Sequence, residues 1–265
     1  MRFGINKELP WLKFALPIII VFMLILGFSG VFFRKVGVDT TFVPKTPMMR
    51  HTKVPERVFR GDLSGKKLVA LTFDDGPAFD TTSRLLDILR DRGAVATFFE
   101  LGTRARGNPE ITKRVFEEGH EIGNHTMYHQ NLAKVPMNEA EDDLNESKGV
   151  FREIIGREPS LTRLPYGNST DFVKEILGTP IIYWSVDTKD WETKDTEKIV
   201  ENVLSTADDG AIILMHDIYS TTIDAVPIVI DRLREDGYEF VTVSELADYR
   251  GVELENGEVY TKFEP

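Results

Sequence analysis

The 265-residue sequence contains no cysteine. This absence excludes disulfide bonds, thiolate metal ligands and a cysteine nucleophile. It suits a protein that works outside the cytoplasm, without establishing that location. Internal repeats and low-complexity tracts are also absent, so the chain is not a repeat array. The length and the 42% of hydrophobic residues fit one full-sized domain with additional segments.

Positive charge is scarce beyond the first part of the chain. The whole chain carries −11 and residues 1–60 carry +7, which leaves −18 for the remainder. A domain this acidic argues against a nucleic-acid partner, which requires a basic surface. Most of the negative charge is typical of a solvated surface. The basic first segment suits anionic lipid or an anionic wall polymer.

One long apolar run lies near the N-terminus. Residues 14–33 carry no charge and number twenty, the length that a helix needs to cross a bilayer. Lys13 precedes the run, Arg34 and Lys35 follow it, and Trp11 suits the interface. The alternative is a cleaved signal peptide, but the run exceeds the usual length and no small-x-small site follows clearly. We therefore predict that residues 1–35 form a cytoplasmic tip and an uncleaved transmembrane anchor.

The pattern changes twice after the anchor. Residues 36–65 contain three prolines and scattered basic residues without a period, which predicts an extended stalk. From Lys66, short apolar runs alternate with amphipathic segments. Strands are predicted at 68–73, 94–99, 121–123, 181–186, 211–215 and 240–243, and helices at 80–92, 108–118, 137–155, 195–208 and 222–236. This alternation predicts an α/β fold with a parallel sheet or barrel.

Five short motifs follow one another along this alternating region. They occupy residues 72–76 (Thr-Phe-Asp-Asp-Gly), 125–129 (His-Thr-Met-Tyr-His), 163–167 (Arg-Leu-Pro-Tyr-Gly), 187–191 (Asp-Thr-Lys-Asp-Trp) and 214–217 (Leu-Met-His-Asp). All but the third lie at or just after the end of a predicted strand. In parallel α/β folds the chemistry gathers beyond the carboxyl ends of the strands, so the motifs are predicted to converge.

The first two motifs contain candidate metal ligands. Asp74 and Asp75 are adjacent carboxylates, which repel each other unless a cation or an arginine lies nearby. His125 and His129 are four residues apart, which places both on one face of a helix or helical turn. Asp75, His125 and His129 are therefore predicted to bind one divalent metal, with a position left for water or substrate. Zinc is preferred, although cobalt, manganese and nickel accept the same ligands.

The remaining carboxylate and the third motif supply a general base. Asp74 is free to take a proton from water, and Arg163 is the natural partner to orient it. Without the other motifs, Arg163 would be interpreted as an ordinary ion-pair residue. Tyr166 lies in a Pro-Tyr-Gly turn, where its backbone N–H can join the metal in stabilising an oxyanion and its ring can simply pack.

The last two motifs supply a general acid. Cleavage of an amide requires a proton on the departing nitrogen, and His216 beside a carboxylate can deliver it. Asp190 is the predicted carboxylate. Trp191 and Leu214 are predicted to wall a small apolar pocket for substrate, with ordinary core packing an equally good reading. Asp187 and Asp217 are predicted only to brace loops.

These motifs resemble those of carbohydrate esterase family four, the polysaccharide deacetylases with a NodB homology domain. The match covers roughly residues 66–250, and one departure is Leu164, where the family commonly has proline. The resemblance implies a distorted (β/α) barrel, a zinc-type Asp-His-His site and removal of acetyl groups from N-acetylated sugars. It implies the same catalytic roles for Asp74, Arg163, Tyr166, Asp190 and His216.

A membrane anchor, a basic stalk and one such domain resemble the peptidoglycan N-acetylglucosamine deacetylases of Gram-positive bacteria. This implies a cell-wall glycan substrate, a catalytic domain over 66–250 and a tail over 251–265. Alternatives are chitin oligomers, acetylated xylan, or a glycan-binding module without catalysis. The basic residues flanking the anchor would place the domain in the cytoplasm. The site suits an outside polymer, so we predict a single-pass protein with an extracytoplasmic domain.

Overall fold

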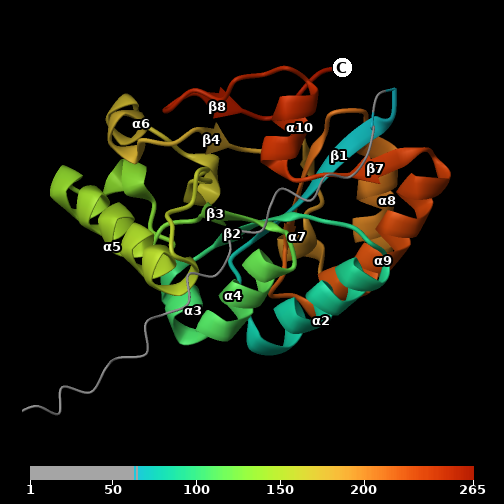
Figure 1. The fold of residues 1–265 in the computed structure, drawn as a ribbon, viewed down its shortest axis with the longest axis horizontal. Helices are drawn as coiled ribbons and strands as arrows, with labels where there is room; N and C mark the ends of the chain where they lie inside the picture. Colours follow the sequence, from blue (N-terminus) through green and yellow to red (C-terminus); the bar gives the residue numbers. More distant parts are fainter. Residues whose placement is uncertain (1–62, 64) are drawn as a thin grey trace, which may run out of the picture. The chain divides into compact units, whose positions relative to one another are not determined.

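The computed structural model describes residue 63 and residues 65–265 (Figure 1). The anchor predicted over residues 14–33, and nearly all of the stalk predicted over 36–65, lie outside these residues. In the part of the chain that is described, no helix is long and apolar enough to cross a bilayer.

A parallel sheet forms the centre of the described region. Its strands follow the order β3-β2-β1-β6-β5, and β7 pairs with the first half of β1. The strands span Lys67–Asp74 (β1), Thr97–Glu100 (β2), Glu121–Asn124 (β3), Val186–Asp187 (β5), Ile212–His216 (β6) and Tyr238–Phe240 (β7). Every one of these pairings is parallel. The predicted α/β class with a parallel sheet is confirmed.

The sheet continues beyond β3 through isolated bridges. Thr162 bridges Asn124 on one side and Ile181 on the other. Ile181 begins β4 (Ile181–Ile182), which pairs with β8 (Val259–Tyr260). Only three residues connect β4 to β5. Because β5 lies at the opposite end of the strand order from β3, the two ends of the sheet curl back toward each other. The segment predicted as a tail over 251–265 belongs to the folded domain, because it contains β8 and the buried Phe263.

The helices connect the strands and cover the sheet. All five predicted helices are present within two residues of their expected ends, and four short helices were not predicted. The helices are α2 (Phe79–Asp91), α3 (Gly102–Gly107), α4 (Pro109–Glu117), α5 (Met137–Ile155), α6 (Asp171–Leu177), α7 (Asp190–Thr193), α8 (Thr196–Thr206), α9 (Ser220–Glu235) and α10 (Val243–Tyr249), with 3₁₀ turns η1 (Leu132–Lys134) and η2 (Pro165–Gly167). Figure 1 shows α2 and α9 side by side, and the two helices are in contact.

Two predicted strands differ from the observed elements. The strand predicted over 181–186 is divided into β4 and β5. The strand predicted over 240–243 ends at Phe240, because Thr242 caps α10. The Thr242 hydroxyl accepts a hydrogen bond from the Glu245 N–H, and the Glu245 carboxylate accepts one from the Thr242 N–H. This reciprocal pair satisfies helix-end donors, which favours a helix start over continued strand.

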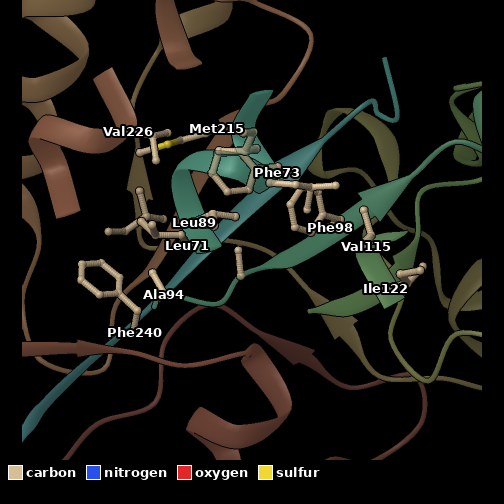
Figure 2. Close-up of a cluster of buried hydrophobic side chains, with 14 of the residues drawn as sticks. Leu71, Phe73, Leu89, Ala94, Phe98, Val115, Ile122, Met215, Val226 and Phe240 are labelled. Carbon is tan, nitrogen blue, oxygen red and sulfur yellow. The ribbon is translucent and has the colours of Figure 1, made fainter. Parts of the chain in front are cut away.

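The core lies between the sheet and the helices (Figure 2). Leu71 and Phe73 of β1 are buried with Phe98 of β2, and the rings of Phe73 and Phe98 lie 5.3 Å apart. Leu89 of α2 and Val226 of α9 belong to the same cluster. Each such side chain contributes about 1.5–3 kcal/mol when fully buried. The core therefore holds β1 rigidly, and β1 ends within the first of the five motifs.

Candidate active site

Strand register brings the first and last motifs together. Asp74, the final residue of β1, is the register partner of His216, the final residue of β6. On its other side Asp74 is paired with Phe99 of β2. The carboxyl ends of these parallel strands form one edge, so residues far apart in sequence lie side by side there.

Three candidate ligands meet at this edge. The Asp75 Oδ1 atom lies 3.5 Å from His125 Nε2 and 3.3 Å from His129 Nε2. The ligand atoms of the three residues all lie within 4.8 Å of one another. Asp75 Oδ1 is buried without a hydrogen-bond partner. A buried carboxylate oxygen facing two imidazole nitrogens fits a divalent cation with three protein ligands.

The protonation states of these groups suit a cation. Burial favours the neutral Asp75 carboxyl, but contact with His125 and the charges of the two histidines outweigh it and lower its pKa to about 2. Burial lowers the pKa of His129, which favours the neutral ring that binds metals. His125 Nδ1 lies 2.7 Å from the Arg163 carbonyl oxygen. A proton on Nδ1 donates to that oxygen and leaves Nε2 free to face the cluster.

The segment that carries the two histidines is not helical, and the prediction of a helical face was wrong. Thr126 and His129 have positive φ angles of 73° and 57°, which a helix does not allow. The buried Asp143 carboxylate of α5 stabilises the loop instead. It accepts hydrogen bonds from the backbone N–H groups of Met127 at 2.6 Å and Tyr128 at 3.3 Å. The spacing of four residues thus brings the rings together through a loop that α5 supports.

Backbone strain is concentrated at the site. Four of the six described non-glycine residues with positive φ belong to the first three motifs: Asp75, Thr126, His129 and Tyr166. Each such conformation costs on the order of 1 kcal/mol or more and persists only where its surroundings enforce it. Two of the candidate ligands are therefore held in orientations that an unconstrained chain would avoid.

Arg163 orients Asp74. Arg163 is fully buried, and its Nη1 donates to Asp74 Oδ1 at 2.7 Å and to the Thr72 hydroxyl at 2.8 Å. Its Nε and Nη2 donate to the carbonyl oxygens of Ile182 and Tyr183, both at 2.9 Å. These bonds fix the guanidinium to β1, to β4 and to the residue that follows β4. Asp74 Oδ1 is thereby held, while Oδ2 lies 3.9 Å from His125 Nε2 and faces the candidate metal cluster.

Asp190 holds His216. Its Oδ1 lies 2.7 Å from His216 Nδ1, and its Oδ2 accepts from the His216 backbone N–H at 2.7 Å and the Thr222 hydroxyl at 2.8 Å. Burial favours the neutral imidazole, but the hydrogen bond and charge of Asp190 outweigh it and raise the pKa of His216 to about 9. The ring is therefore protonated at neutral pH and can donate from Nε2.

The three candidate ligands, Asp74 and His216 line one cavity of about 500 Å³. Trp191 is 49% exposed and Tyr166 is 68% exposed, whereas Leu214 is buried at the wall. The positive φ of Tyr166 turns its ring to within 4.9 Å of the His129 ring. Eight of the predicted site residues line the cavity: Asp74, Asp75, His125, His129, Tyr166, Trp191, Leu214 and His216. Arg163 and Asp190 lie behind this wall, in contact with Asp74 and His216.

Sequence reasoning missed several residues of the site. Leu164, Trp184 and Tyr219 also line the cavity. Tyr219 lies two residues after the last motif, and an aromatic residue so close to a strand-end histidine is a usable signal. Trp184 lies in a segment predicted as strand, and period alone does not show which face such a residue occupies. Asp187 lines the cavity and also braces its loop, because Oδ1 accepts from the Lys189 N–H at 2.9 Å.

A substitution at Gly76 tests how closely the turn that carries Asp75 is packed. A Cβ at this position would overlap the buried carboxylate of Asp217, which is held by the Thr82 hydroxyl at 2.5 Å. Gly76→Ala is therefore expected to displace the adjacent Asp75 and to weaken zinc binding by about tenfold or more. Isothermal titration with zinc measures the loss, and Gly107→Ala, with open space around its position, is the matched control. Equal zinc affinity in both variants would contradict this packing argument.

Glu100 makes folding stability depend on pH. Burial raises the pKa of Glu100 to about 8, and its Oε1 is buried without a partner. The folded protein thus retains a proton that the unfolded chain loses near pH 4.5. This contribution to stability is complete below that pH and is lost as the pH rises through about 8. Melting temperatures from about pH 5 to about pH 9 should therefore fall more steeply for wild type than for Glu100→Gln. Parallel curves would exclude the effect.

The sequence matches the family model described as polysaccharide deacetylase over residues 62–179. It is 40% identical over 185 residues to the peptidoglycan-N-acetylmuramic acid deacetylase PdaC of Bacillus subtilis, covering 70% of this chain and 40% of that protein. It is 40% identical over 195 residues to a peptidoglycan-N-acetylglucosamine deacetylase of Bacillus cereus, covering 71% of this chain and 91% of that protein. The chain thus spans well under half of PdaC but nearly all of the Bacillus cereus protein.

A solved structure shows the same fold. A family 4 acetyl xylan esterase from Clostridium thermocellum, in complex with a cobalt ion, superposes with a TM-score of 0.71 at 31% identity. The superposition covers 74% of this chain and 98% of that one.

Proposed function

The chain belongs to the polysaccharide deacetylase family, and on that basis we propose that it hydrolyses N-acetyl groups on N-acetylglucosamine residues of peptidoglycan and releases acetate. The observation that carries the proposal is the convergence of a three-residue metal cluster, a held carboxylate and a protonated histidine in one cavity. A glycan-binding module without catalysis would not need this complete set. The reaction is the cleavage of an amide C–N bond by water.

Asp75, His125 and His129 would hold the metal, and we propose zinc. Carboxylate and imidazole ligands accept cobalt, manganese or nickel as well. When bound, the metal supplies Lewis acidity that polarises the acetyl carbonyl and lowers the pKa of water.

The chain's own residues carry the proton transfers. Asp74 Oδ2 takes a proton from the attacking water as the new C–O bond forms, while Arg163 fixes the other oxygen. His216 then gives its Nε2 proton to the sugar nitrogen as the C–N bond breaks. Asp190 stabilises the charged imidazole before that transfer. The products are acetate and a free amine on the sugar.

The cavity walls would position the acetyl group. Trp191 and Leu214 offer apolar surface for its methyl group, and the backbone N–H of Tyr166 is the proposed donor to the oxyanion. A small apolar wall beside polar catalytic groups is the usual design of a site that binds a short acyl chain.

The identity of the sugar is part of the proposal. One relative is named for N-acetylmuramic acid and another for N-acetylglucosamine, and both names refer to peptidoglycan. We propose N-acetylglucosamine. Chitin oligomers and acetylated xylan are the alternative substrates, the second because of the similarity to an acetyl xylan esterase.

We also propose that the chain is a single-pass membrane protein with its catalytic domain outside the cytoplasm. The twenty uncharged residues at 14–33 support the anchor, and a wall polymer as substrate supports the orientation. Protease added outside intact cells would remove the catalytic domain if the orientation is right, and would leave it intact if the domain is cytoplasmic.

Acetate release by the full chain, purified in detergent, tests the activity. Peptidoglycan, chitotetraose and acetylated xylan are compared with added zinc and with a chelator. Release from peptidoglycan that the chelator abolishes and zinc restores supports the proposal. Release from xylan alone would assign an esterase instead, and no release from any polymer by folded, zinc-loaded protein would overturn the deacetylase.

A further inference from the structure

A second cavity lies beside the catalytic one. Its volume is about 850 Å³, and it shares His129 and Tyr166 with the catalytic cavity. Its other walls come from the loop after His129, from η1 and from the turn after Tyr166. The two cavities therefore adjoin at these two residues, and we name the second one the side groove.

The side groove has a polar lining on a supported frame. Gln130, Asn131 and Asn168 present amide groups to it. The side-chain Oδ1 of Asn131 accepts hydrogen bonds from the Ala133 N–H at 3.2 Å and from Asn168 Nδ2 at 3.4 Å, which connects the two walls. Amide groups arranged in this way suit the hydroxyl groups of a sugar ring.

Lys134 is the one lining residue of the side groove with a full charge. It is the last residue of η1, and the neighbouring Leu132 is buried in a core cluster, so the turn is anchored. Lys134 is exposed and has no ion pair within the described residues. The region that follows residue 60 carries a net charge of −18. An unpaired ammonium group in such an acidic domain is available to a ligand.

We propose that the side groove binds the sugar next to the one being deacetylated, and that Lys134 binds a carboxylate carried by that part of the glycan. The inference rests on the proposed function and deepens it, because it makes the preferred substrate an anionic glycan. Two sources supply this chemistry in peptidoglycan: the lactyl group of a muramic sugar without its peptide, and the carboxylates of an attached peptide. Chitin carries neither.

The test compares kcat/KM of the full chain on three glycans: chitotetraose, peptide-free glycan strands with open lactyl carboxylates, and strands with peptides attached. The measured quantity is the ratio of kcat/KM on an anionic glycan to that on chitotetraose. For Lys134→Gln this ratio is expected to fall about three- to fivefold, the range of an exposed ion pair. Lys134→Arg should keep the ratio, and so should Lys198→Gln, which removes an exposed lysine of α8.

Each outcome has a defined meaning. A fall on peptide-free strands assigns the lactyl carboxylate, and a fall only on strands with peptides assigns the peptide. An unchanged ratio in Lys134→Gln, or an equal fall in Lys198→Gln, overturns the role of Lys134 while acetate release still supports the deacetylase. If the wild-type chain releases no acetate from any of the three glycans, the proposed function fails and this inference fails with it.

Discussion

Replacing Asp74 by asparagine is expected to lower kcat for acetate release by about 10²- to 10⁴-fold, the usual contribution of a general base. The asparagine keeps the shape of the side chain and can still accept the hydrogen bond from Arg163. It has no oxygen basic enough to take a proton from water. Because Asp74 is not among the three clustered ligands, the variant should still bind zinc.

Two measurements separate this interpretation from general damage to the site. Titration with zinc shows whether the cluster of Asp75, His125 and His129 is intact. Asp80→Asn, on the exposed surface of α2, is the matched control for loss of an aspartate charge. An Asp74→Asn variant that binds zinc normally and keeps more than about a tenth of the activity would remove Asp74 from the role of base.

Loss of His216 is expected to have the second largest effect. His216→Ala should lower kcat by about 10²- to 10⁴-fold, because it removes the proposed proton donor to the departing nitrogen. The active form of this residue is the protonated ring, so activity is present below its pKa and is lost as the pH rises through it. Wild-type kcat should therefore decline above about pH 9.

The pH profile of a second variant tests whether loss of the His216 proton causes the alkaline decline in kcat. Asp190→Asn removes the charge that raises the pKa of His216, so the alkaline decline should move to lower pH. The rate should fall most at alkaline pH and least at mildly acidic pH. The comparison uses kcat between about pH 6 and about pH 10, where both protonation states are sampled. A profile of unchanged shape in Asp190→Asn would show that the decline arises elsewhere.

Buried hydrogen bonds hold both the proposed base and the proposed acid at several points. Arg163 uses Nε, Nη1 and Nη2 in hydrogen bonds that join Asp74 to the backbone of neighbouring segments. Asp190 accepts four hydrogen bonds, one of them from the His216 ring. Side chains held at several points cannot reorient to replace a missing group. The base and the acid are therefore expected to have no substitutes.

Much of the fold was predictable because its main elements follow from local pattern. The apolar run before Asp74 has the length and composition of a buried strand, and it is the observed β1. The long helix over 137–155 was predicted with its observed ends, since Gly156 adopts the left-handed conformation that ends a helix. Short helices such as α3 and α10 were missed because six or seven residues are too few to show a period.

The sequence by itself determined which chemical groups are available. Carboxylates and histidines follow strands, and parallel strands end at a common edge, so the ligands, the base and the acid could be named from pattern and chemistry. These conclusions depend only on where each strand ends along the chain, which the pattern of apolar residues indicates.

Tertiary structure alone decided how these groups meet. The loop that carries His125 and His129 takes its shape from Asp143 of α5, a helix outside the five motifs. Lys134 and Tyr166 line the same side groove, and Leu132 of η1 and Leu164, which precedes η2, belong to one buried cluster. Contacts between residues distant in sequence set these positions, and their energies come from burial and hydrogen bonds that no local pattern encodes.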